Sequence, residues 1–280
     1  MDWALIVSFA LLLKSGAPPA KPASQVASAP ATSANYQPSP GEDSQAERQL
    51  LDLANQARAA AGVPPLSPDD GLAAAASAHN QAMANQQQLS HQFPGEPSLA
   101  QRVAQSSNLH LDRAGENVAV AETVDGLQNV LMHSPPHREN LLNPEYNVAG
   151  FSVIRLGERL YAVQDFGHQL PTLPPDAATE TIAAGFQRLR DQDRLPALSR
   201  SDGSQAQAMA CAMAKADALN TLPPQSHYVL RYTTMDPGRL PAGAEKVVGN
   251  RALRSFSVGS CYARTATYPN GVYWVALLLD

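Results

Sequence analysis

The chain has 280 residues, enough for two domains of ordinary size. Apolar residues make up 44% and charged residues 16% of the sequence, so a sizeable core can form. The formal net charge is −5 and Lys and Arg are scattered rather than clustered, which argues against a nucleic-acid-binding protein. No apolar run reaches the roughly 20 residues that a membrane-spanning helix needs.

The first 42 residues differ in composition from the rest of the chain. Residues 1–14 open with the apolar run "MDWALIVSFALLL", which predicts a signal peptide or an N-terminal anchor. Residues 15–42 consist largely of Ala, Pro and Ser and have too few apolar side chains to offset the entropy cost of ordering, so they predict a disordered linker. Together these segments predict a secreted, periplasmic or cell-envelope protein.

Helical patterns follow the linker. Ser44 and Glu47 form a capping-box pattern, and apolar residues then recur at helical spacing until Gly62 and two prolines. A second helix is predicted in "GLAAAASAHNQAMANQQQLSH", starting near Asp70 and carrying His79 on its apolar face as a core residue. Loops are expected next, and then a third helix over residues 124–132.

Strand patterns occupy the next stretch of the chain. "NVAGFSVIR" and "RLYAVQDFG" are rich in β-branched and aromatic residues, and "LGE" between them predicts a hairpin link. Residues 170–178 are rich in proline and mark a domain boundary.

The second half of the chain repeats part of the first. An alignment pairs Arg58 with Arg190 and His79 with Cys211, and a later hairpin is predicted around a Pro-Asn-Gly turn at residues 269–271. Nothing in the second half matches the polar residues discussed next. Cys211 and Cys261 can form a bridge in an oxidising compartment or remain buried thiols, and the sequence leaves both open.

His91, Glu116 and His137 are the residues most suited to chemistry. They are 25 and 21 residues apart, each in or beside a predicted loop or element end. Two imidazoles and a carboxylate can hold Zn²⁺ or a similar divalent ion, and a His–Glu pair can transfer protons near neutral pH. Their spacing does not choose between these roles and a hydrogen-bonded core.

The order of four segments is more informative than any single residue. "SHQF", "AGENVA", "LMHSPPHRENLLNPEYNVAGFSV" and "YAVQDFG" together resemble the CAP superfamily of cysteine-rich secretory, antigen 5 and pathogenesis-related class 1 proteins, and its exported bacterial members most. The resemblance covers about residues 46–168. It implies an α+β fold, an α–β–α sandwich around an antiparallel sheet over residues 43–170. The internal repeat predicts that a smaller degenerate CAP-like α+β unit follows over 177–280.

The resemblance also implies a cavity with two histidines and two acids. His91 and His137 match the histidines and Glu116 matches the acid of the GEN motif, while Asn117 is expected to orient a tight turn there. The second acid has no match. The supporting residues at that point are Ser134, which stands at its position, and His133, which is expected at the end of a helix.

Three functions follow from these residues. We favour an exported binding module whose ligand is a divalent metal such as Zn²⁺, a lipid, a small molecule or a cell-envelope component, with no nucleic-acid partner. The first alternative is a metal-assisted hydrolase with Glu116 as the catalytic base. The second is a structural or interaction protein whose second repeat serves only for packing. The sequence leaves enzymatic activity undecided.

Overall fold

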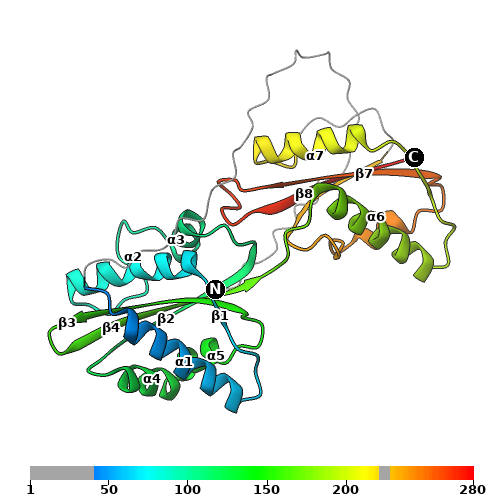
Figure 1. The fold of residues 1–280 in the computed structure, drawn as a ribbon. Coiled ribbons are helices and arrows are strands. Elements are labelled where there is room, and N and C mark those ends of the chain that lie inside the picture. Colours follow the sequence, from blue (N-terminus) through cyan, green and yellow to red (C-terminus); the bar gives the residue numbers. More distant parts are fainter. Residues whose placement is uncertain (1–40, 221–227) are drawn as a thin grey trace. The chain divides into compact units, whose positions relative to one another are not determined.

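The computed structural model describes residues 41–220 and 228–280, drawn in colour in Figure 1. The predicted signal peptide or anchor, and the linker up to residue 40, lie outside the described residues. Two compact units are present: one ends at Leu170, and the other runs from Pro171 to Asp280. None of the helices in the described part is long and apolar enough to cross a membrane.

The first unit is a four-stranded sheet with helices on both faces. Strand order is β1-β3-β4-β2, with β1 parallel to β3 and the other pairs antiparallel. The elements are α1 (Ser44–Ala60), β1 (Ser67–Pro68), α2 (Asp70–Gln86), α3 (Leu99–Ser106), β2 (Leu111–Ala121), α4 (Val124–His133), α5 (Pro135–Leu141), β3 (Val148–Leu156) and β4 (Arg159–Gln169).

The layers follow from the alternation of side chains along the strands. Leu50 of α1 and Leu127 of α4 pack with Phe166 on one face of the sheet, whereas Met83 of α2 packs with Val163 on the other. Figure 1 shows α1, α4 and α5 on one side of the sheet and α2 on the other. The predicted α–β–α sandwich with an antiparallel hairpin is therefore confirmed for this unit.

The first helix begins differently from the prediction. Its N-cap is Asp43, whose side chain accepts a hydrogen bond from the backbone N of Ala46 (3.0 Å). Glu47 instead accepts from the backbone N of Val153 on β3 (3.1 Å). The capping box predicted from Ser44 is wrong because the carboxylate one residue earlier already satisfies the helix terminus, which leaves Glu47 free to tie α1 to the sheet.

Elements absent from the sequence prediction include β2, α3 and α5. The loop expected around residues 115–117 is the middle of β2, and α3 and α5 are short helices within predicted loops. Gly115 resembles a turn residue, but its role is to make room, because a Cβ atom there would overlap the hydroxyl of Tyr146.

The second unit has the same sheet topology. Its strand order is β5-β7-β8-β6, again with one parallel pair followed by antiparallel pairs. The elements are α6 (Pro175–Gln192), β5 (Ser199–Arg200), α7 (Ser204–Ala216), β6 (Tyr228–Thr234), α8 (Ala244–Val248), β7 (Ser255–Ala263) and β8 (Val272–Leu279). The expected second α+β unit is therefore present.

One pairing in the sequence alignment of the two halves is wrong. A Cβ atom on Gly150 would overlap Ala73 of α2, and one on Gly259 would overlap Gln207 of α7, so these two glycine–helix crossings are equivalent. Asp69 alone separates β1 from α2, whereas residues 201–203 separate β5 from α7, so α7 starts two residues later. Cys211 therefore corresponds to Ser77, and Met213 to His79.

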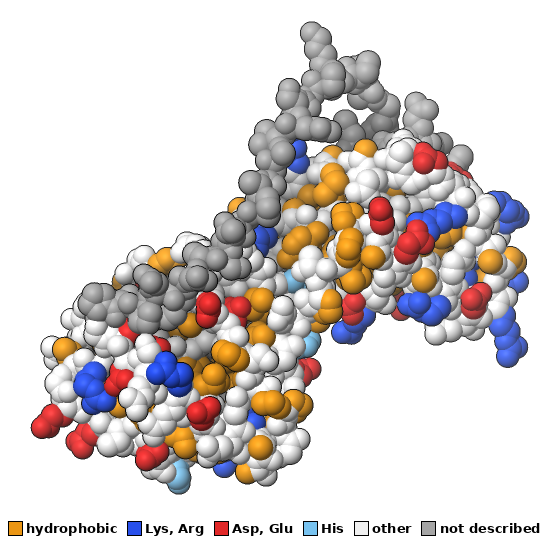
Figure 2. All heavy atoms as spheres, viewed as in Figure 1, with side chains coloured by type: hydrophobic (Ala, Val, Ile, Leu, Met, Phe, Trp, Pro, Cys, Tyr) orange, Lys and Arg blue, Asp and Glu red, His pale blue; other side chains and the backbone are white. Residues whose placement is uncertain are grey.

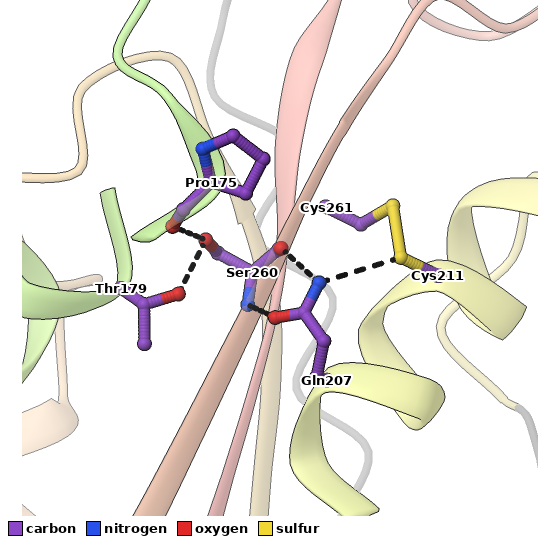
Figure 3. The surroundings of a disulfide bond; sticks show 6 residues. All are labelled: Pro175, Thr179, Gln207, Cys211, Ser260 and Cys261. Atoms are coloured by element: carbon purple, nitrogen blue, oxygen red, sulfur yellow. Dashed lines mark hydrogen bonds between the residues drawn. A yellow bond between two sulfur atoms is a disulfide. The ribbon is translucent and has the colours of Figure 1, made fainter. Parts of the chain in front are cut away.

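Cys211 and Cys261 form a disulfide that ties α7 to β7. Their Cα atoms are 5.1 Å apart. Beside the bridge, the side chain of Gln207 donates to the backbone O of Ser260 (2.8 Å) and accepts from its N (3.1 Å), as Figure 3 shows. Of the two alternatives left open by the sequence, the structure contains the bridge.

Candidate functional site

The three predicted site residues meet at the β2 edge of the first sheet. His91 lies in the segment after α2, Glu116 on β2 and His137 on α5. The Nδ1 atom of His91 is 3.0 Å from Oε1 of Glu116, and the ring centroids of His91 and His137 are 6.0 Å apart. Residues distant in sequence therefore form one cluster.

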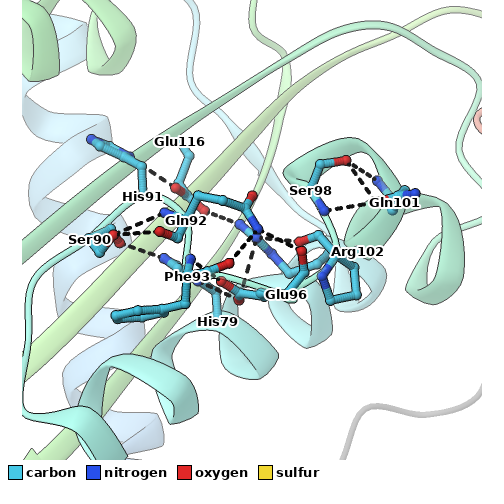
Figure 4. A network of polar contacts seen from close by, with 11 residues as sticks. His79, Ser90, His91, Gln92, Phe93, Glu96, Ser98, Gln101, Arg102 and Glu116 are labelled. Atoms are coloured by element: carbon cyan, nitrogen blue, oxygen red, sulfur yellow. Dashed lines mark hydrogen bonds and ion pairs between the residues drawn. The ribbon is translucent and has the colours of Figure 1, made fainter.

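Glu116 is the buried member of this cluster. Its side chain is 5% exposed, whereas that of His91 is 57% exposed. Its Oε2 atom accepts a hydrogen bond from Nη2 of Arg102 on α3, itself buried (Figure 4). Both carboxylate oxygens therefore have partners, and a guanidinium compensates the charge of the acid.

His137 is held close to neutral charge. Burial lowers the pKa of its imidazole below the usual value, and the neighbouring His91 lowers it further. At neutral pH the ring is therefore uncharged and has a lone pair on one nitrogen, which is the form that binds a metal or accepts a proton.

Asn117 fixes α5, and so His137, against the sheet. Its Nδ2 atom donates to the backbone O of His137 (2.9 Å) and to Oε1 of Gln164 (3.1 Å). Its Oδ1 atom accepts from Nδ2 of Asn140 (3.1 Å). Asn117 was expected to orient a tight turn. It lies within strand β2 instead, and its side chain positions helix α5.

A second acid is present at a position that the sequence prediction missed. Asp165 on β4 lies opposite Glu116 in the strand register, and it is fully buried. Neither of its carboxylate oxygens has a hydrogen-bond partner among the residues that the structure describes. Burial raises the pKa of Asp165 well above its usual value, Glu116 raises it further and Arg102 opposes both. The acid within the predicted strand over residues 159–167 was the available signal.

The two remaining supporting residues are not joined to this cluster by a hydrogen bond within the described ranges. His133 is exposed at the end of α4, where its Nδ1 atom bonds the backbone O of Asn129 (2.8 Å), as expected for a helix terminus. Ser134 is the N-cap position of α5 and makes no side-chain cap bond.

The side chains that could bind a metal ion are His, Cys, Asp and Glu. Across residues 41–220 and 228–280, no group of three or more His, Cys, Asp or Glu side chains has an arrangement that could hold a metal. The contact of Nδ1 of His91 with Glu116 resembles the hydrogen bond that metal-binding histidines commonly donate to a carboxylate, and metal binding by His91 and His137 stays a prediction. Glu116 as a third ligand stays a prediction.

The sandwich with its edge cluster defines an α+β domain with a surface site. Residues 51–166 match the model of the cysteine-rich secretory protein family, CAP. These residues of the first unit therefore carry a CAP domain, which confirms the resemblance seen in the motifs.

Two curated relatives come from Bacillus subtilis (strain 168). The chain is 31% identical over 121 residues to the uncharacterized protein YkwD, a match covering 42% of this chain and 46% of YkwD. It is 34% identical over 122 residues to the uncharacterized membrane protein YlbC, covering 43% of this chain and 34% of YlbC. The chain thus spans less than half the length of each.

Solved structures include an extracellular protein containing an SCP domain from Bacillus anthracis str. Ames. It is 27% identical, with a TM-score of 0.40, and the match covers 45% of this chain and 41% of that protein.

Proposed function

We propose that this chain is an exported binding module whose first unit holds a divalent cation such as Zn²⁺ through His91 and His137. The observation that carries the proposal is the 3.0 Å contact between Nδ1 of His91 and Glu116, with a second imidazole 6.0 Å away. Glu116 then orients His91, so that Nε2 carries the free lone pair. Zn²⁺ and related ions accept neutral imidazole nitrogen readily.

Export is part of the proposal. The related structure from Bacillus anthracis is described as extracellular, and another from Borrelia burgdorferi as an outer surface protein. The disulfide between Cys211 and Cys261 is of the kind that persists in oxidising compartments. On the face shown in Figure 2, basic side chains are interspersed with acidic ones, which supports a partner other than a nucleic acid.

The hydrolase alternative has less support. A carboxylate that acts as a general base needs an oxygen available to the attacking water. Both oxygens of Glu116 are occupied, one by His91 and the other by Arg102. Binding without turnover is the function that these contacts favour.

Calorimetric titration of the full chain with Zn²⁺ and Mg²⁺ tests the proposal. Zn²⁺ should bind the wild type and should bind His91→Ala and His137→Ala at least about tenfold more weakly, while Mg²⁺, which prefers oxygen ligands, should not bind. His133→Ala is the matched control, since this exposed histidine bonds only its own helix in the described structure. Equal Zn²⁺ affinity in the wild type and both site variants would refute the two-histidine site.

A further inference from the structure

A chain of buried polar side chains leads from α2 to His91. It begins at His79, which is fully buried. Its Nδ1 atom is 2.6 Å from Oε1 of Glu96, and its Nε2 atom is 2.7 Å from the backbone O of Ser90. Both ring nitrogens of His79 therefore have a polar partner. The second contact fixes the residue immediately before His91.

Glu96 is the next member of this chain. Besides its contact with His79, it accepts a hydrogen bond from the backbone N of Phe93 through Oε2 (3.1 Å). Its Oε1 atom is also 3.6 Å from Nη1 of Arg102. Glu96 therefore joins two parts of the segment that carries His91, and it links that segment to α3.

Arg102 completes the connection. Its side chain is 3% exposed, its Nη1 atom donates to the backbone O of Pro97 (3.0 Å), and its Nη2 atom donates to Glu116. Polar contacts thus link His79, Glu96, Arg102 and Glu116 in turn, and Figure 4 shows this network running to His91. This network contacts His91 at two points: at the backbone O of Ser90, the preceding residue, and at the ring Nδ1 atom of His91 itself.

We infer that His79, Glu96 and Arg102 are positioning residues for His91. They hold the imidazole with Nδ1 directed at Glu116, which fixes the tautomer that leaves Nε2 free for a ligand. The inference rests on the proposed metal site for its ligand, but the tautomer of His91 can be observed without any metal. A buried polar network suits this task because each member is satisfied by its neighbours, and removing one leaves the others without a partner.

The test uses the isotope-labelled full chain, free of metal, with the variants Arg102→Met, Glu96→Gln and His79→Phe. Nuclear magnetic resonance of the imidazole nitrogens should show the Nδ1–H tautomer of His91 in the wild type and its loss in the variants. Arg102→Lys should retain part of it, because an ammonium can still reach Glu116. Zn²⁺ affinity should fall about tenfold or more in the same variants, the usual effect of losing a group that orients a ligand.

Asn80→Ala is the control for general destabilisation. Asn80 is buried on the same helix as His79, but its side chain donates to Ser152 and Tyr161 rather than to the segment that carries His91. This variant should lose stability and keep the His91 tautomer. A wild-type tautomer in folded Glu96→Gln and Arg102→Met, or its loss in Asn80→Ala as well, would overturn the inference. Absence of Zn²⁺ binding to the wild type would overturn the proposed function alone.

Discussion

Arg58 in α1 and Arg190 in α6 are buried arginines that make similar contacts in the two units. Nε of Arg58 donates to the backbone O of Pro64 (2.7 Å), and Nε of Arg190 to that of Pro196 (2.9 Å). Nη1 of both arginines, and Nη2 of Arg58, donate to further backbone carbonyls. For Arg58 these are Leu141, Asn143 and Tyr146, and for Arg190 they are Val248 and Asn250. Each arginine thus ties the end of the first helix to a distant loop.

Replacing either arginine should destabilise its own unit. Arg58→Met and Arg190→Met remove the donors and leave several carbonyls unsatisfied, at an expected cost of about 3 kcal/mol each in the free energy of unfolding. Urea unfolding followed by hydrogen exchange would show which unit opens. Arg48→Met is the control, because Arg48 is exposed on α1. If both arginine variants unfolded as the control does, the shared contact would have no stabilising role.

Much of the fold was predictable where local pattern and tertiary role agree. The hairpin of β3 and β4, the helices that Gly and Pro terminate, and the pairing of Arg58 with Arg190 are of this kind. β2 was missed because Gly115 and Asn117 are typical of turns, although here they serve a contact with Tyr146 and a bond to α5. Local propensity was overridden by packing.

Some residues of the candidate site were predictable from the sequence and others were not. His91, Glu116 and His137 were found because they belong to recognisable motifs. Arg102 and Asp165 were missed because nothing near them in sequence shows that their side chains lie beside Glu116. The S-x-x-Q pattern at Ser98 and Gln101, which forms a capping box in the structure, could have predicted α3 and so directed attention to Arg102.

The disulfide should stabilise the second unit. Cys211 and Cys261 are separated by 50 residues, and the loop-entropy model gives about 4 kcal/mol for a closure of this length. Cys211→Ala with Cys261→Ala should therefore lower the free energy of unfolding of that unit by about this amount, measured by urea denaturation. Adding a reductant should destabilise the wild type and leave the double variant unchanged. An equal response of both proteins to the reductant would contradict the prediction.

Gly150 and Gly259 should be intolerant of any side chain. Each lies where a helix crosses the sheet at backbone contact, so Gly150→Ala and Gly259→Ala require a helix to move, at an expected cost of about 3 kcal/mol or more. Gly185→Ala is the control, since a Cβ atom in that position of α6 meets its nearest neighbour at 3.5 Å. The control should be neutral or slightly stabilising. Thermal unfolding of the three variants checks the ranking, and equal melting temperatures would refute it.

Glu47 should make stability depend on pH. Burial raises its pKa from 4.5 to about 7, and the nearby Glu42 and Asp43 add to the effect. Between these two values the folded chain keeps a proton that the unfolded chain releases, so this contribution to stability falls as pH rises from about 4.5 to about 7 and stays lost above it. Glu47→Gln keeps the acceptor for Val153 and removes the ionisation, so its gain over the wild type in urea unfolding should be larger at about pH 8 than at about pH 5. Glu158→Gln, at an exposed position, should show no such change. A pH-independent difference between Glu47→Gln and the wild type would show that the buried carboxyl does not control stability in this range.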